Sequence, residues 1–268
     1  MVKDRFDFDA NTIEDARLYM LSRAKQLLRF HYKLVNIVEE QWGISAYFDK
    51  SGILYQSLYI LKDFRGKGIY PSKVTNTIIT TKECNISAYL DKKNIKYVEL
   101  NISFPEYTLM GNIYGSEKSK RSGVYLMNHI DEGLYILEKL KASKIAKAAY
   151  VIHPLLQSDE SLVDNFYLLE KINPLVILLA TEYRSVANEY LSNREISTVE
   201  DIRLSPLKEV NQMLIADKIQ NNKDFELYHK DIHPRSNELS KYFRNWLNRL
   251  EVSDDFYKEC VEYCTDYN

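Results

Sequence analysis

The sequence predicts an α+β protein in which a small mixed α/β domain over residues 1–105 precedes an all-helical bundle over residues 106–268. Two patterns predict this division: strand-like alternation with turns runs from residue 43 to residue 101, and helical spacing of apolar residues follows from Pro105 onward. A chain of 268 residues with 45% apolar side chains is also long enough to form two cores.

The N-terminal domain is expected to begin with one long amphipathic helix or a helix pair. Between Thr12 and Trp42, apolar residues recur at every third or fourth position. Short β-rich runs bounded by turn residues predict strands at residues 44–48, 54–61, 77–80 and 95–100. Residues 82–93 have helical spacing between the last two strands. These elements predict a long helix packed on a small sheet.

The C-terminal domain is expected to hold seven helices, with glycine and proline residues near their ends. They are predicted at residues 129–140, 145–156, 162–171, 175–191, 206–227, 236–250 and 254–264. No internal repeat or low-complexity tract interrupts this series in the sequence, which favours a helical bundle.

Charge and cysteine content argue against several classes of protein. The 36 basic and 38 acidic side chains nearly cancel, so no global field favours general nucleic-acid binding or an anionic membrane. Cys84, Cys260 and Cys264 show neither a disulfide framework nor zinc-finger spacing, which indicates a reducing compartment. The charged N-terminus and the lack of a run of about 18 apolar residues predict a cytoplasmic protein with no membrane partner.

Three polar residues, His129, His153 and Asp217, stand where a plain core helix would carry apolar side chains. An ionised carboxylate within the apolar turn at Asp217 is costly unless it meets a cation or strong donors. Two imidazoles and a carboxylate are suitable ligands for a divalent transition metal. Asn221 follows one turn after Asp217 and could bind substrate or orient a ligand. Each histidine alone is more often structural, and Asp217 could equally form an ion pair with a lysine.

The order of these residues resembles the small alarmone hydrolases, a family with a helical HD domain. The family's basic residue, glycine, tyrosine and histidine have counterparts in RSGVYLMNHI, which includes Arg121, Tyr125 and His129. The family's apolar-H-D segment is matched by VIHP at His153. Its K-L-A-D-K-x-x-N pattern is matched by MLIADKIQNNKDF at Ala216, Asp217, Lys218, Asn221 and Asp224. The resemblance covers residues 121–225. It implies removal of pyrophosphate from the 3′ position of guanosine tetra- or pentaphosphate with manganese as the metal cofactor.

The sequence departs from the family at the second motif. Pro154 replaces a metal-binding aspartate, and Gln157 and Ser158 replace the acidic pair that activates water. Three protein ligands with a water can still form a catalytic site. The candidates for accepting the water proton are Asp159 and, as further possibilities in the sequence, Glu160, Asp131 and Glu132. Alternatively, Asp159 and Glu160 are first-turn acids of the next helix, favoured by its dipole.

Substrate contacts are expected from cationic residues near these motifs, because a polyphosphorylated nucleotide needs compensating charge. The candidates are Arg121, Lys218 and Lys208, with Tyr125 from the first motif and with Arg184 and Asn188 on a shared helix face. Any one of these lysines could instead lie on a solvated helix face. His229 and His233 form an HxxxH pair without an adjacent glutamate, so they are expected to be structural or exposed.

The N-terminal domain contains a second candidate site. In ILYQSLYILKDFRGKGIY, a predicted strand leads into Arg65, Gly66 and Gly68, which could present backbone amides to an anion. This loop resembles the acetyl-CoA pyrophosphate loop of the GNAT acetyltransferases, R-x-x-G-x-G/A, and the resemblance covers residues 44–100. Tyr70 stands where the family has a small residue, and Pro71 shortens the helix that normally follows. A GNAT-like platform for a homo-oligomer or a protein partner is therefore favoured over acetyl-CoA binding.

Three functions follow from these patterns. The first is a metal-dependent phosphohydrolase that acts on a phosphorylated nucleotide, with an alarmone as the leading substrate. The second is a nucleotide-binding or sequestering module that has lost catalysis, which Pro154 and Gln157 favour. The third is a CoA-dependent N-acetyltransferase that works through the N-terminal domain.

Overall fold

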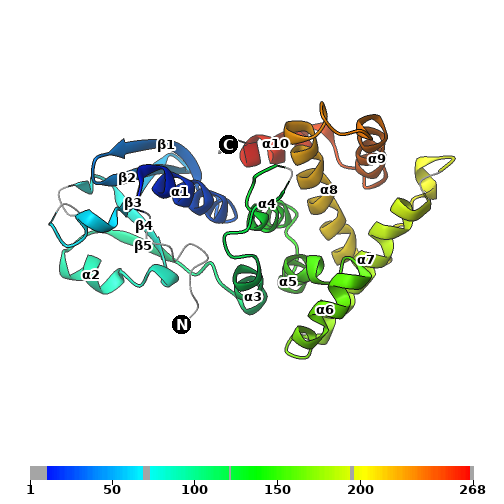
Figure 1. Cartoon of the computed structure of the whole chain (residues 1–268), viewed down its shortest axis with the longest axis horizontal. Coiled ribbons are helices and arrows are strands. Elements are labelled where there is room, and N and C mark those ends of the chain that lie inside the picture. Colours follow the sequence, from blue (N-terminus) through cyan, green and yellow to red (C-terminus); the bar gives the residue numbers. More distant parts are fainter. Residues whose placement is uncertain (1–10, 69–72, 121, 194–195, 266–268) are drawn as a thin grey trace. The chain divides into compact units, whose positions relative to one another are not determined.

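The computed structural model describes residues 11–68, 73–120, 122–193 and 196–265. Within these residues the chain forms ten α-helices and one five-stranded mixed sheet, which confirms the α+β class. The chain divides into two compact units (Figure 1). Unit 1 comprises Met1–Phe104 with Tyr263–Asn268, and unit 2 comprises Pro105–Glu262.

Unit 1 contains the sheet, whose strands follow one another in the order β1-β2-β3-β4-β5. Their bounds are β1 Lys33–Glu40, β2 Gly43–Lys50, β3 Ile53–Ile60, β4 Thr77–Thr81 and β5 Tyr97–Leu100. The first three strands are antiparallel, and the β3–β4 and β4–β5 pairs are parallel. Helix α1 (Ile13–Leu28) packs on β1, β2 and β3, and buries most residues of its second half.

The predicted helix over Thr12–Trp42 is wrong in its second half. Helix α1 ends at Leu28, His31 turns the chain with a φ of 63°, and Lys33–Glu40 then forms strand β1. The segment KLVNIVEE is rich in β-branched residues, and the spacing of its apolar residues fits both the repeat of a helix and the alternation of a strand. Pairing with β2 along its whole length decides in favour of the strand.

A second correction concerns the predicted helix over residues 82–93. A 3-10 turn covers Lys82–Cys84, Asn85 adopts a left-handed φ of 48°, and α2 is confined to Ser87–Lys92. Asparagine tolerates this conformation and divides the segment into two short pieces.

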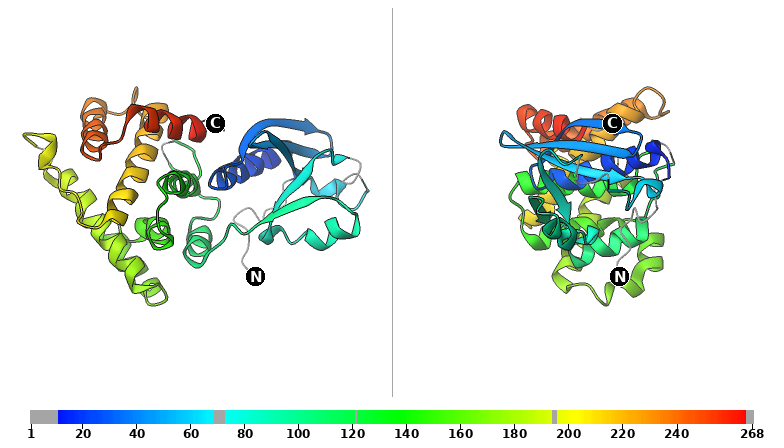
Figure 2. Two further views of the ribbon diagram at one scale, coloured as in Figure 1. Left: turned by 180° about the vertical axis from the view of Figure 1, so that it is seen from behind. Right: turned by 90° about the vertical axis from the view of Figure 1, so that its left-hand side faces the viewer.

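Unit 2 is built from helices, and its described residues contain only an isolated bridge between Lys118 and Tyr125 in place of a sheet. The helices are α3 Pro105–Tyr114, α4 Leu126–Lys139, α5 Lys144–Ile152, α6 Asp159–Leu169, α7 Pro174–Asn193, α8 Lys208–Tyr228, α9 Ser236–Arg249 and α10 Asp254–Thr265, of which the part up to Glu262 belongs to unit 2. All seven predicted helices are present, and α3 was not predicted. Helix α8 packs against α4, α5, α7 and α9, which makes it the central element of the unit (Figures 1 and 2).

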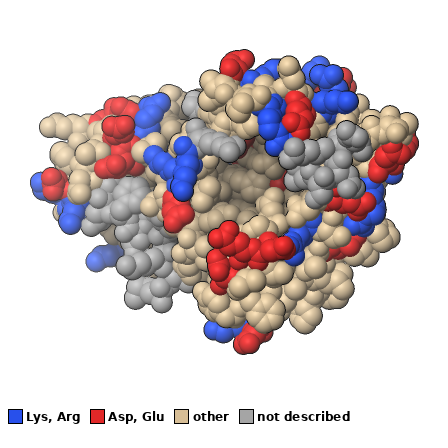
Figure 3. Space-filling view, turned by 45° about the vertical axis from the view of Figure 1, so that its right-hand side comes forward, with Lys and Arg blue, Asp and Glu red and all other residues tan. Residues whose placement is uncertain are grey.

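Two further features concern the charge of the surface and the hydrophobicity of the helices. Basic and acidic side chains are interspersed on the face shown in Figure 3, with uncharged surface between them. Among the described residues, none of the helices has the length and apolar character needed to cross a membrane.

Candidate metal centre

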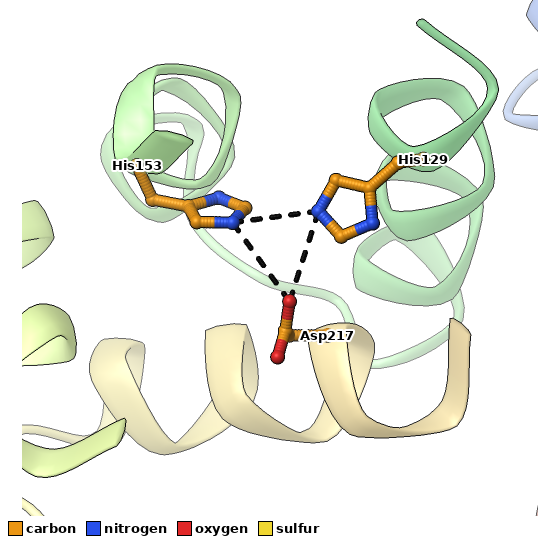
Figure 4. A group of neighbouring side chains, drawn as sticks. All are labelled: His129, His153 and Asp217. Atoms are coloured by element: carbon orange, nitrogen blue, oxygen red, sulfur yellow. Dashed lines mark hydrogen bonds and ion pairs between the residues drawn. The ribbon is translucent and has the colours of Figure 1, made fainter. Parts of the chain in front are cut away.

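Helices α4, α5 and α8 bring together the three residues that the sequence singled out. His129 lies in the first turns of α4, His153 caps the C-terminus of α5, and Asp217 lies in the middle of α8. Their side chains converge on one point (Figure 4). Within the described part of the chain, they form the one group of three or more histidine, cysteine or acidic side chains close enough to share a metal ion.

Pro154 explains the position of His153. Helix α5 ends at Ile152, and residues His153–Leu155 form a 3-10 turn with the proline in its first positions. A proline lacks the N–H needed to continue an α-helix, so the chain leaves α5 directly after the histidine. The imidazole is thus placed at a helix end, and it is only 1% exposed.

The separations of the three ligand atoms fit a transition metal. His129 Nε2 lies 3.4 Å from His153 Nε2, and Asp217 Oδ1 lies 3.7 Å and 3.8 Å from the two nitrogens. The point in the plane of these three atoms that is equally far from all of them lies about 2.1 Å from each. Zinc binds imidazole nitrogen and carboxylate oxygen at about 2.0–2.2 Å, so a metal ion at this point would have normal ligand distances. Calcium requires oxygen ligands at about 2.3–2.6 Å, so it fits this donor set poorly.

Hydrogen bonds on the far side of each imidazole orient its Nε2 atom toward this point. His153 Nδ1 lies 2.5 Å from the carbonyl oxygen of Tyr150, and His129 Nδ1 lies 2.6 Å from Gln220 Oε1. A carbonyl oxygen can only accept, so Nδ1 of His153 carries the proton and Nε2 holds a lone pair. Burial, followed by the neighbouring imidazole of His129, lowers the pKa of His153 to about 4. His153 is therefore neutral at pH 7, as a metal ligand must be.

Two neighbours on α8 hold the carboxylate of Asp217. Lys218 Nζ donates to Oδ2 at 2.8 Å, and Asn221 Nδ2 donates to Oδ1 at 2.8 Å. Burial acts to raise the pKa of Asp217, but the Lys218 ammonium and the two imidazoles outweigh it and hold this pKa far below its usual range. Asp217 is thus ionised although only 1% of the residue is exposed.

Aromatic rings enclose the buried side of the centre. Tyr150 and Tyr183 have ring centroids 4.9 Å and 4.8 Å from that of His153, and both tyrosines are fully buried. Tyr150 also donates to the backbone oxygen of His129 at 3.2 Å. Gly133 on α4 makes room for this ring, because a Cβ atom there would lie 2.0 Å from the Tyr150 hydroxyl oxygen.

A pocket of about 260 Å³ lies on the accessible side of His129. It is lined by Ser119, Ser122, Val124, Tyr125, Leu126, His129, Asn221, Asp224, Phe225, His229, His233, Leu239 and Phe243. The structure thus brings two predicted substrate-binding residues, Tyr125 and Asn221, into the same pocket as His129, a predicted metal ligand. His229 and His233, expected to be structural or exposed, also line this pocket. Both histidines lie beyond the end of α8, which stops at Tyr228. In the sequence, their four-residue spacing continues that of Asn221 and Phe225, and this spacing could have indicated a shared site.

Several predicted site residues lie apart from the centre. Asp159 is the first residue of α6, its side chain is 96% exposed, and it forms an ion pair with Arg184. Lys208 is exposed at the start of α8, about 13 Å before Asp217 along the axis and on the opposite face. Lys218 is directed into the protein, where its Nζ lies 5.5 Å from the ring centroid of Trp246. The ammonium group of Lys218 therefore interacts with the carboxylate of Asp217 and does not face the pocket beside His129.

The remaining acidic candidates beside His129 are buried and bound to other groups. Asp131 accepts a hydrogen bond from the Tyr107 hydroxyl at 2.7 Å, and Glu132 forms an ion pair with Lys223 at 2.7 Å. Arg121 lies outside the described residues. Among the residues that are described, no carboxylate other than Asp217 joins the two imidazoles.

The RGKG loop of unit 1 borders a separate pocket of about 590 Å³, whose lining includes Arg65, Gly66 and Gly68. Both glycines have positive φ, 75° and 72°. The Arg65 guanidinium folds back, donating to the Ile60 oxygen at 3.0 Å and to the Tyr59 hydroxyl at 3.2 Å. The described residues between Gly68 and β4 contain no α-helix, and Tyr70 and Pro71 lie outside the described residues.

Comparison with known proteins gives no relative: no family model, no curated protein and no solved structure matches the chain.

Proposed function

We propose that unit 2 is a metal-dependent phosphohydrolase of the HD type that acts on a phosphorylated nucleotide, with an alarmone as the leading substrate. One observation carries the proposal: two imidazole lone pairs and an ionised carboxylate converge within 3.8 Å of one another. Three atoms with lone pairs at these separations repel one another unless a proton or a metal ion lies between them. The resemblance of residues 121–225 to the alarmone hydrolases supports this choice of substrate.

The residues of the centre would divide the work as follows. His129, His153 and Asp217 would hold manganese or a similar divalent ion. Such a metal supplies a water of lowered pKa for attack on phosphorus. Asn221 and Tyr125 line the adjoining pocket and would position the nucleotide beside the ligands. The aromatic rings behind His153 exclude bulk water from that side, which strengthens the electrostatic interactions of the carboxylate.

A second candidate function is nucleotide binding without hydrolysis. It is favoured by the position of Asp159, whose carboxylate is exposed and paired with Arg184 instead of facing the ligands. Glu132 is likewise held by Lys223. A general base must lie within hydrogen-bond reach of the proton that it removes. With these two acids engaged elsewhere, such a module would capture its ligand and retain it.

The finer fold assignment is part of the same proposal. We propose that unit 1 is GNAT-like and that unit 2 is an HD-type bundle. Support for unit 1 comes from the parallel pairing of β3, β4 and β5 beside the RGKG loop. CoA-dependent acetyl transfer remains a third candidate. It is weakened by the Arg65 guanidinium, which bonds to Ile60 and Tyr59 within its own loop and strand.

The test is metal analysis of the full-length protein, followed by incubation with manganese and guanosine or adenosine polyphosphates. The wild type should retain a stoichiometric metal and release phosphate or pyrophosphate, and His153→Ala should lose both. His31→Asn is the matched control, because it removes an imidazole from unit 1 and asparagine accepts the left-handed φ of that position. Metal and nucleotide binding without product would select the sequestering function. A wild type that binds no metal would refute the proposed centre.

A further inference from the structure

A chain of buried polar groups extends from His129 into the core of unit 2. Gln220 on α8 accepts at 2.6 Å from His129 Nδ1, and its amide nitrogen donates to Glu132 Oε2 at 3.1 Å and to Asp224 Oδ2 at 2.8 Å. Lys223 forms ion pairs with the same two acids, at 2.7 Å and 2.8 Å. Gln220, Glu132 and Lys223 are each at most 3% exposed.

The two carboxylates fix which way the Gln220 amide faces. A carboxylate can only accept a hydrogen bond, so the amide NH₂ group must point toward Glu132 and Asp224. The amide oxygen is then the atom that faces His129. Burial alone would lower the pKa of Lys223, but the charges of Glu132 and Asp224 raise it above its usual range, so Lys223 remains a cation between the two acids.

The fixed amide in turn determines the tautomer of His129. An oxygen 2.6 Å from Nδ1 is a favourable contact only if Nδ1 carries the proton. In the neutral imidazole, the one proton is then on Nδ1, and Nε2 holds a lone pair that faces His153 and Asp217. Histidines that bind metals usually donate their other N–H to an acceptor that fixes the ring and raises its basicity.

We propose that Gln220 is the positioning residue that makes His129 a metal ligand, and that Glu132, Lys223 and Asp224 serve to hold the Gln220 amide in its orientation. The inference rests on the proposed metal centre for its functional meaning. Its structural content, the protonation of Nδ1 in His129, stands on the hydrogen bonds alone.

The experiment compares Gln220→Met with Gln212→Met in the full-length protein. Gln212 lies on the same helix about 12 Å away, is also buried, and donates to the Leu140 oxygen at 3.0 Å, so its replacement is a matched loss of one buried amide. Zinc and manganese affinities are measured by calorimetry. Nitrogen-15 NMR of labelled histidine in the metal-free protein, assigned with a His129→Gln variant, reports the tautomer.

The expected result is that Gln220→Met weakens metal binding by about 10- to 100-fold and abolishes the Nδ1–H preference of His129, whereas Gln212→Met does neither. Unchanged affinity or an unchanged tautomer in Gln220→Met would overturn the proposal. If Gln220→Met does not fold, the wild-type spectrum decides, because a dominant Nε2–H form of His129 would contradict the assignment. If the wild-type protein shows the Nδ1–H form of His129 but binds no metal, the proposed metal centre is refuted. The orientation of His129 by Gln220 would still hold in that case.

Discussion

The side chains of Asp217 and Lys218 contact each other although the two residues are consecutive on α8. Lys218 Nζ lies 2.8 Å from Asp217 Oδ2, and both residues are buried. Consecutive residues on a helix normally point in different directions, so the long lysine side chain must turn back to reach the acid. The ammonium is left between the carboxylate and the rings of Tyr242 and Trp246. The protein thus supplies one cation to Asp217 from the side opposite the histidines.

Replacing Lys218 by methionine should therefore leave a buried carboxylate without its cation. Removing one partner of a buried ion pair typically costs about 3–5 kcal/mol in the free energy of unfolding. Urea denaturation of the metal-free protein, followed by helical circular dichroism, measures this loss. Lys208→Met on the exposed opposite face of the same helix is the control and should change stability by less than about 0.5 kcal/mol. Equal effects of the two substitutions would contradict the role of Lys218.

The sequence predicted the residues of the centre but only part of their roles. The apolar turn around Asp217 indicated a buried acid that needs a cation, and the structure places two imidazoles and an ammonium around it. The role of Gln220 could not be predicted, because it depends on Glu132, which lies 88 positions earlier in the chain. Lys218 was predicted to bind substrate, and its contact with Asp217 could not be predicted, because a sequence does not show which way a flexible lysine turns.

Acid should destabilise the metal-free protein through His153. Its pKa is lowered to about 4 in the folded protein, against 6.5 for an unperturbed histidine, so the unfolded chain takes up the proton first. The stabilising contribution is complete above about pH 6.5 and is lost as the pH falls toward 4, by an amount on the order of 3 kcal/mol. Unfolding free energies measured in the presence of a chelator, for the wild type and His153→Gln, test this. The variant should show a flatter profile between pH 4 and 6.5.

Asp159 should prove dispensable for metal binding. Its carboxylate is 96% exposed and pairs with Arg184 at the surface, where an ion pair contributes only about 0–1 kcal/mol. We expect Asp159→Asn to retain the metal affinity of the wild type in calorimetry. Asp217→Asn, the same chemical change inside the cluster, should lose most of it. A large loss of affinity in Asp159→Asn would show that α6 moves its first turn to the ligands and would restore Asp159 as a catalytic candidate.

The fold was predictable where local signals agree. Proline and glycine near the helix ends gave the seven helices of unit 2, and short β-rich runs gave four strands of the sheet. Strand β1 was missed because the spacing of its apolar residues also suits a helix, and only its pairing with β2 decides the outcome. The end of α5 was placed too late, because the sequence pattern continued through Pro154 whereas the α-helix stops at Ile152. That early stop puts His153 at the helix end.

Gly133 should be required for the wall behind the metal centre. An added Cβ would lie 2.0–2.3 Å from three atoms of the buried Tyr150 side chain, so Gly133→Ala must displace the tyrosine ring from His129 and His153. Overpacking of this kind typically costs about 1–3 kcal/mol, and it should also weaken metal binding. Gly111→Ala on α3 is the control, because a Cβ there meets no atom within 4 Å and alanine favours the helix by up to about 1 kcal/mol. In denaturation curves, Gly133→Ala should lower the free energy of unfolding and Gly111→Ala should raise it. In metal titrations, only Gly133→Ala should lower the affinity. A Gly133→Ala protein as stable as the wild type would mean that Tyr150 does not pack against α4 in this way.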